Sequence, residues 1–209
     1  MAFFERRDFP WLDALEAQTA AIRDEFLAVL AQDQGFTPYL QYGDDQPLRQ
    51  WDELNGSLRW SAFHLLEGGH VNQDNARRCP RTMATLAGAP QPDQPGRTPV
   101  AMFSMLKPRT RIPPHCGVSN VRLVTHLPLV VPPGCGFRVG NEVRAWEEGR
   151  AWVFDDTIEH EAWNDSDQLR AIFMFDIWHP HLTGPERVLI TAMSAAMQDF
   201  SDGEGGDAL

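Results

Sequence analysis

The sequence predicts a mostly β fold, a sandwich or jelly roll, with a helical layer at its N-terminal side. Three observations predict it: short apolar or alternating runs from Val100 onward, turn residues between them, and a helical pattern of apolar residues before them. Closely spaced strands with intervening turns are typical of β-sandwiches and jelly rolls. With 209 residues, 43% of them hydrophobic, the chain is long enough to bury its own core.

The first 99 residues are expected to form a helical and irregular layer. Apolar residues recur at helical spacing over 10–31 and predict an amphipathic helix there. Residues 33–77 are polar and predicted to be irregular, with aromatic anchors at Tyr39, Trp51, Trp60 and Phe63. A short helix is expected over 81–86, and a proline-punctuated loop over 88–98.

The β core is expected over 100–180. Its predicted strands are 100–107, 121–131, 136–140, 143–146, 151–154, 158–163 and 169–178. Residues 184–200 predict a closing helix, and 201–209 an acidic, disordered tail. We therefore expect a single domain over 1–209.

Composition excludes several classes of function. The 29 acidic residues outnumber the 18 basic ones, giving a net charge of −11, and no basic stripe is present to follow nucleic-acid phosphates. No run approaches the ~20 apolar residues of a membrane span. Charges near the N-terminus argue against a signal peptide, and three cysteines do not form a disulfide scaffold, so we expect a cytoplasmic protein.

Three histidines stand out by their positions. His115 follows a proline pair at the mouth of a predicted strand, and His160 lies at a strand edge. Within 121–131, alternation places Arg122, Val124 and His126 on one face. A histidine and an arginine that share a face with an apolar neighbour predict the wall of a polar pocket.

A further arginine begins the last predicted strand. Arg170 shares a face with Asp176, and both faces of 169–178 are mostly apolar, which predicts a central strand. A charge in such a strand needs a partner, which is either Asp176 or an anionic ligand. Two histidines from separate strands and a fixed cation are what an Fe(II) oxygenase with a dicarboxylate co-substrate requires.

The order of these motifs resembles the catalytic domain of aspartyl/asparaginyl β-hydroxylases from about Val100 to Pro180. The residues that carry the resemblance are Ser104-Met-Leu-Lys-Pro-Arg-Thr-Arg-Ile-Pro-Pro-His115, Arg122-Leu-Val-Thr-His-Leu127, His160-Glu-Ala-Trp163, Arg170 and Asp176-Ile-Trp-His-Pro180. The resemblance implies a cupin-like double-stranded β-helix that binds Fe(II), 2-oxoglutarate and O₂. It also implies that the metal centre, and no side-chain acid or base, performs the chemistry.

The resemblance also implies a role for seven residues. The metal ligands would be His115 and His160. The distal carboxylate of 2-oxoglutarate would lie at Ser104 and Arg170, and its metal-bound end at His126. The substrate side would be lined by Arg122 and Asp156, although Asp155 and Asp156 also suit a turn.

Two features concern the metal-bound end of the co-substrate. Many Fe(II) oxygenases carry His-x-Asp/Glu, but His115-Cys116-Gly117 has no carboxylate, and the β-hydroxylases use water there. Val124 stands where the mammalian members have an arginine, so the contact to the proximal carboxylate is changed.

These features predict a 2-oxoglutarate-dependent dioxygenase acting on an unactivated carbon. The leading substrate is the β-carbon of an Asp or Asn residue in a peptide or protein. The alternatives are a free amino acid such as proline, a lipid acyl chain, or a non-catalytic cupin-like binding module. The lipid is the weakest alternative, because no membrane segment or basic amphipathic helix is present. His64 and His70 are expected at the surface, and His179 and His181 at a strand end.

Overall fold

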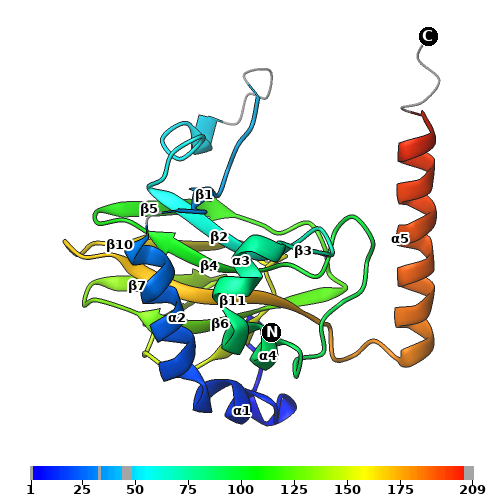
Figure 1. The fold of residues 1–209 in the computed structure, drawn as a ribbon, viewed down its shortest axis with the longest axis horizontal. Helices are drawn as coiled ribbons and strands as arrows, with labels where there is room; N and C mark the ends of the chain where they lie inside the picture. Colours follow the sequence, from blue (N-terminus) through cyan, green and yellow to red (C-terminus); the bar gives the residue numbers. More distant parts are fainter. Residues whose placement is uncertain (1, 33, 44–48, 205–209) are drawn as a thin grey trace.

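The computed structural model describes residues 2–32, 34–43 and 49–204, whose strands form two antiparallel sheets (Figure 1). The larger sheet contains, in spatial order, β1 (Thr37–Pro38), β2 (Trp60–Glu67), β4 (Ala101–Leu106), β11 (Arg170–Trp178), β6 (Arg122–Val130) and β9 (Trp152–Phe154), with β3 (His70–Val71) paired to β2. The smaller sheet contains β5 (Thr110–His115), β10 (His160–Asn164), β7 (Cys135–Val139) and β8 (Glu142–Arg144).

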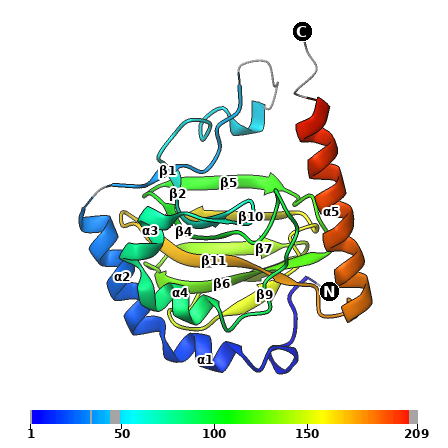
Figure 2. The same ribbon diagram turned by 45° about the vertical axis from the view of Figure 1, so that its right-hand side comes forward.

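The chain crosses between the two sheets as it runs from β4 to β11 (Figure 2). Strands β4, β6, β9 and β11 lie in the larger sheet, and β5, β7, β8 and β10 in the smaller one. This order is that of a jelly roll, or double-stranded β-helix, so the predicted mostly β fold class is confirmed.

Four of the described strands lie where the sequence predicted none: the two-residue strands β1 and β3, and the longer strands β2 and β5. β5 contains Pro113 and Pro114, a pair that indicates a turn by composition; here it lies at an edge of the smaller sheet, where missing N–H groups are tolerated. β2 lies in the segment predicted to be irregular and pairs with β4, and its side chains are nearly all buried. His64 lies on β2 and is only 17% exposed at its side chain, so it is not the surface residue expected.

The helices differ from prediction mainly in their bounds. The single helix expected over 10–31 is two, α1 (Leu12–Ala17) and α2 (Thr19–Ala31), joined at Gln18. α3 (Gln73–Arg78) was not predicted, whereas α4 (Pro80–Leu86) matches the helix expected over 81–86. α5 (Gly184–Glu204) extends into the segment expected to be a disordered tail, of which residues 205–209 lie outside the described residues.

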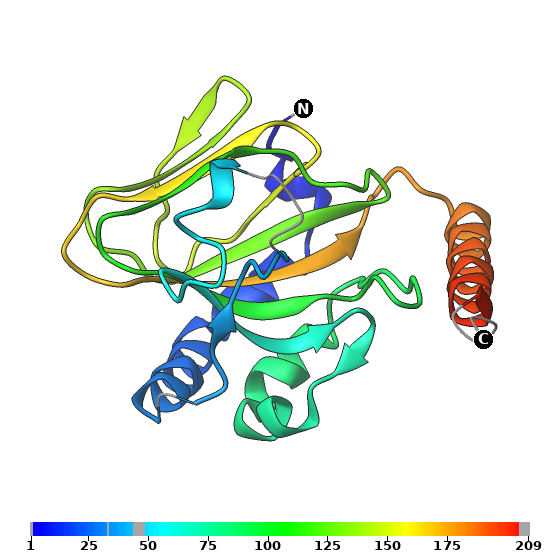
Figure 3. The ribbon, with the colours of Figure 1, turned by 90° about the horizontal axis from the view of Figure 1, so that it is seen from above.

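Two apolar layers result from the strand alternation. Helices α1, α2 and α4 cover one face of the larger sheet, and the smaller sheet covers the other (Figure 3). Along β11, Phe173, Phe175 and Ile177 face the helices, whereas Ile172 and Met174 face the smaller sheet. The space between the sheets is therefore lined by one face of β4, β6 and β11.

Candidate metal and ligand site

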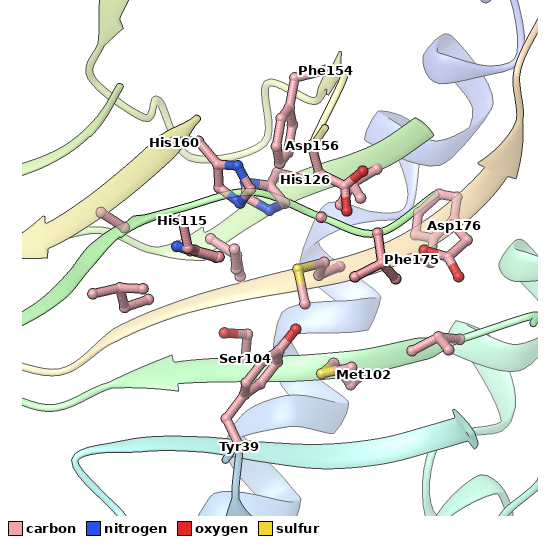
Figure 4. A pocket seen from close by; sticks show the side chains of 18 of the residues that line it. Tyr39, Met102, Ser104, His115, His126, Phe154, Asp156, His160, Phe175 and Asp176 are labelled. Atoms are coloured by element: carbon pink, nitrogen blue, oxygen red, sulfur yellow. The ribbon is translucent and has the colours of Figure 1, made fainter. Parts of the chain in front are cut away.

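A cavity of about 780 Å³ lies between the two sheets (Figure 4). The structure brings together there all the residues that the sequence singled out: Ser104, His115, Arg122, His126, Asp156, His160 and Arg170. They come from β4, β5, β6, β10, β11 and the turn before β10, which shows how the jelly roll collects distant residues. His179 and His181 lie beyond the end of β11 and do not line this cavity.

His115 and His160 lie side by side on two adjacent strands of the smaller sheet. They are paired in register on β5 and β10, and their ring centroids are 4.1 Å apart. Each ring Nδ1 lies against a backbone carbonyl two residues earlier, at 2.8 Å for His115 and 2.9 Å for His160. A carbonyl only accepts, so each Nδ1 carries the proton and each Nε2 lone pair is available.

Both rings are neutral at neutral pH. Burial and the neighbouring His160 lower the pKa of His115 to about 4, and burial lowers the pKa of His160. Neutral imidazoles whose Nδ1–H is held by a carbonyl are the form in which histidine binds a metal. Within the described part of the chain, no third His, Cys, Asp or Glu completes a metal-binding group with them.

Arg170 is a buried cation without an acidic partner. It is 1% exposed, and among the described residues no carboxylate forms an ion pair with it. Its guanidinium lies 4.9 Å from the ring centre of Trp146, and its Nη1 donates to the Ser104 carbonyl at 3.4 Å. Burial lowers the pKa of Arg170 to about 10. The site is therefore short of one anion.

Asp176, one of the two partners predicted for Arg170, pairs with Arg122 instead. Asp176 Oδ1 lies 3.1 Å from Arg122 Nη1, and Asp156 Oδ2 lies 3.0 Å from Arg122 Nη2. The register explains this: Asp176 is opposite Val124 and Trp178 is opposite Arg122, so Arg122 is the diagonal neighbour of Asp176. Burial raises the pKa of Asp176 to about 6 and also raises that of Asp156.

Gly117 allows Asp156 to occupy this position. A Cβ on Gly117 would lie 2.2 Å from Asp156 Oδ2, closer than real atoms approach, so any side chain there would displace the carboxylate. The backbone N–H of Gly117 also donates to the Asp156 carbonyl at 2.6 Å. The residues after β5 are therefore fitted closely to the turn that carries Asp156.

His126 lies at the inner wall of the cavity. It is 3% exposed and surrounded by the rings of Phe137, Phe154 and Trp146, and its Nδ1 has no hydrogen-bond partner. Burial and the charge of Arg170 hold its pKa well below the usual value, so the ring is neutral. The face predicted for 121–131 is confirmed, since Arg122, Val124 and His126 all line the cavity.

Two aromatic side chains of the site were expected only as packing anchors. Trp60 donates its indole N–H to Ser104 Oγ at 3.2 Å, and the Tyr39 ring stacks on Trp60 with centroids 3.8 Å apart. The Tyr39 side chain lines the cavity (Figure 4), and burial raises the pKa of its hydroxyl to about 12.

The fold and the cavity define a class of protein, a double-stranded β-helix with two neutral histidines beside a buried unpaired arginine. The family model described as Aspartyl/Asparaginyl beta-hydroxylase matches residues 16–180. The chain belongs to the aspartyl/asparaginyl β-hydroxylase family.

Sequence identity to two named relatives agrees with this. The chain is 37% identical over 182 residues to the human aspartyl/asparaginyl beta-hydroxylase, covering 86% of this chain but 22% of that protein. It is 34% identical over 193 residues to the ornithine lipid ester-linked acyl 2-hydroxylase of Rhizobium tropici, covering 91% of this chain and 64% of that protein. Among solved structures, a predicted oxalate decarboxylase from Thermotoga maritima has a TM-score of 0.37 at 14% identity, covering 57% of this chain and 81% of that one.

Proposed function

We propose that this chain is an Fe(II)- and 2-oxoglutarate-dependent dioxygenase that hydroxylates the β-carbon of an Asp or Asn residue in a peptide or protein. Membership of the family and the 37% identity to the human aspartyl/asparaginyl beta-hydroxylase support the reaction type and the substrate. The chain spans about a fifth of the length of that relative, so only the shared segment supports the comparison.

The observation that carries the proposal is the unpaired guanidinium of Arg170. Burying a cation without a partner costs several kcal/mol of folding free energy, because the ion loses its hydration and gains no compensating charge. A ligand carboxylate removes this cost, because a guanidinium grips a carboxylate with two parallel hydrogen bonds. Ser104, which lies beside Arg170, adds a hydroxyl donor. We assign the distal carboxylate of 2-oxoglutarate to this pair.

The two histidines of the site are suitable ligands for Fe(II). Two imidazoles from paired strands, both neutral and both with Nε2 available, are ligands that iron accepts. We assign the metal to His115 and His160, with water in place of a protein carboxylate. When bound, iron with 2-oxoglutarate and O₂ supplies the oxidising power for hydroxylation.

The remaining residues bind, orient and exclude water. The aromatic rings around His126 keep the inner wall dry and hold this ring against the metal-bound end of the co-substrate. Because Val124 offers no charge there, His126 provides the polar group of β6 at that end. None of these side chains needs to accept a proton from the substrate.

We place the substrate beside Arg122 and Asp156. Asp176 lies six residues beyond Arg170 on the same face of β11, roughly 20 Å along the strand. The ion pairs around Arg122 therefore lie beyond the reach of a five-carbon co-substrate held at Arg170. Two carboxylates hold the Arg122 guanidinium in place, and this side chain lines the cavity.

Consumption of 2-oxoglutarate tests the proposal. Purified protein with Fe(II), ascorbate, 2-oxoglutarate and a panel of Asp- or Asn-containing peptides is expected to release succinate and to add one oxygen to a peptide by mass spectrometry. Arg122→Ala is expected to lose the peptide-dependent part of this turnover. Tight binding of metal and co-substrate without turnover on peptides, amino acids or lipids would instead support the non-catalytic binding module.

One observation favours a lipid acyl chain as the second candidate substrate. The face of α5 that meets the body is polar: Thr191 donates to the Asp93 carbonyl at 2.6 Å, and Gln94 donates to Ser194 at 3.4 Å. Its solvent-facing side is apolar, with the exposed residues Val188, Leu189, Met193, Met197 and Phe200. Gln94 also lines the cavity, so the polar face of α5 adjoins a residue of the cavity wall.

An exposed apolar helix face suits a surface of lipid, and the Rhizobium relative is named for an acyl-chain reaction. Within the described residues, no helix is long and apolar enough to cross a membrane. Succinate release that depends on acyl lipids dispersed in detergent, and not on peptides or a free amino acid such as proline, would make this candidate the function.

A further inference from the structure

The Ser104 hydroxyl has a neighbour that fixes its role in hydrogen bonding. The indole Nε1 of Trp60 lies 3.2 Å from Ser104 Oγ, and both side chains are buried. An indole N–H only donates, so Ser104 Oγ accepts in this contact. Among the described residues, the structure gives no acceptor for the Ser104 proton, which therefore remains available to a ligand in the cavity.

Strand register places the three donors next to one another on one face of the larger sheet. Ser104 on β4 is paired with Ala62 on β2 and with Ile172 on β11. Trp60 and Arg170 are the residues two positions from these partners, so both are diagonal neighbours of Ser104 on the same face. An indole N–H, a hydroxyl and a guanidinium thus follow one another across three strands.

Packing holds Trp60 before any ligand arrives. Its ring is stacked on that of Tyr39 with an interplanar angle of 10°, and its carbonyl accepts from the Tyr39 N–H at 3.0 Å. The Trp51 ring lies on it at a centroid distance of 6.1 Å, and Trp60 is 5% exposed. An indole enclosed in this way presents its N–H in one direction.

We propose that Trp60 is a positioning residue whose indole N–H orients the Ser104 hydroxyl to donate to the distal carboxylate of the co-substrate. The inference rests on the proposed function, because it takes that anion to be 2-oxoglutarate. A free hydroxyl rotates among several directions and is ordered at the moment of binding. Here the indole occupies its acceptor side in advance, so less ordering remains to oppose binding.

Calorimetric titration of 2-oxoglutarate into the Mn(II)-loaded protein, without O₂, tests this on binding alone. Trp60→Phe keeps an aromatic ring for the stack on Tyr39 and removes the indole N–H together with one of the two fused rings. We expect its Kd to rise about fivefold, the factor that one ordinary hydrogen bond contributes. In a Ser104→Ala background, Trp60→Phe should have no further effect, because the indole acts through the hydroxyl. An equal loss in both backgrounds would overturn the inference.

A second ligand makes the result independent of protein stability. 2-Oxobutyrate has the same metal-binding end but no distal carboxylate, so its affinity should be the same in the wild type and in Trp60→Phe. The ratio of the two affinities is measured within one protein sample, and therefore a general loss of stability does not change it. An equal loss for both ligands would show a merely structural role.

Failure of the inference and of the proposed function give different results. If Arg170→Gln and Ser104→Ala both leave the affinity for 2-oxoglutarate unchanged, the assignment of the co-substrate is wrong. If those two variants weaken binding while Trp60→Phe does not, only the role of Trp60 is overturned.

Discussion

Asp176 on β11 forms an ion pair at 3.1 Å with Arg122 on the adjacent strand β6. It does so although Arg170 lies on the same strand and the same face as Asp176. This single pairing divides the charges of the cavity. At one end, two carboxylates share one guanidinium; at the other, Arg170 is buried with no acidic partner among the described residues. Because of this pairing, we assign the end at Arg170 to an anion and the end at Arg122 to the substrate.

Removing the charge of Arg170 should remove most of the affinity for a dicarboxylate. Arg170→Gln is expected to weaken binding of 2-oxoglutarate about 100-fold or more, as loss of a buried charge-assisted pair does. The matched control is Arg111→Gln, an exposed arginine on β5 outside the cavity, which should have no effect. Calorimetry on the Mn(II)-loaded proteins measures both.

Metal binding should depend on His115 and His160 and not on the histidines beyond β11. His115→Ala is expected to lower the affinity for Mn(II) at least about 100-fold, since only one protein ligand then remains. His179→Ala removes an imidazole of the same kind outside the cavity and should change nothing. Equal affinity in all three proteins would show that the metal lies elsewhere.

Asp176 should make the protein less stable as pH rises. Its folded pKa of about 6 lies above the ordinary value of 3.8, so the folded state holds this proton more tightly than the unfolded state does. Stability is therefore lost as pH rises from about 4 to above 6, by up to about 3 kcal/mol at 1.36 kcal/mol per pKa unit. Urea unfolding of wild type and Asp176→Asn across this range measures the difference.

The difference between the two unfolding curves is the test. Wild type should lose stability relative to Asp176→Asn as pH rises, and a parallel Asp199→Asn variant, at an exposed position on α5, should follow wild type. A difference that stays constant from pH 4 to 7, or that grows in favour of wild type, would contradict the raised pKa.

Gly117→Ala should disturb the turn that carries Asp156. The new methyl would lie 2.2 Å from Asp156 Oδ2, so the carboxylate must leave its place against Arg122. We expect a loss of roughly 1–3 kcal/mol in the free energy of unfolding, as overpacking causes. Gly184→Ala, where nothing lies within 4 Å, should be close to neutral by the same urea assay.

The sequence predicted more of the site than of the N-terminal layer. Alternation assigned the faces of β6 and β11 correctly, because a strand has a period of two whatever its neighbours. It did not assign the partner of Asp176, which depends on the register between β11 and β6. β2 was missed since its burial, and with it the role of Trp60, comes from pairing with β4.

An anaerobic titration with Fe(II) and 2-oxoglutarate, followed by visible absorption, tests the central claim most directly. Wild type is expected to develop the weak charge-transfer band of iron chelated by a 2-oxo acid. His115→Ala should lack the band, and Arg170→Gln should need far more 2-oxoglutarate to reach it. Tight binding of Fe(II) without any band in the wild type would contradict the account, because the unpaired Arg170 would then serve some other anion.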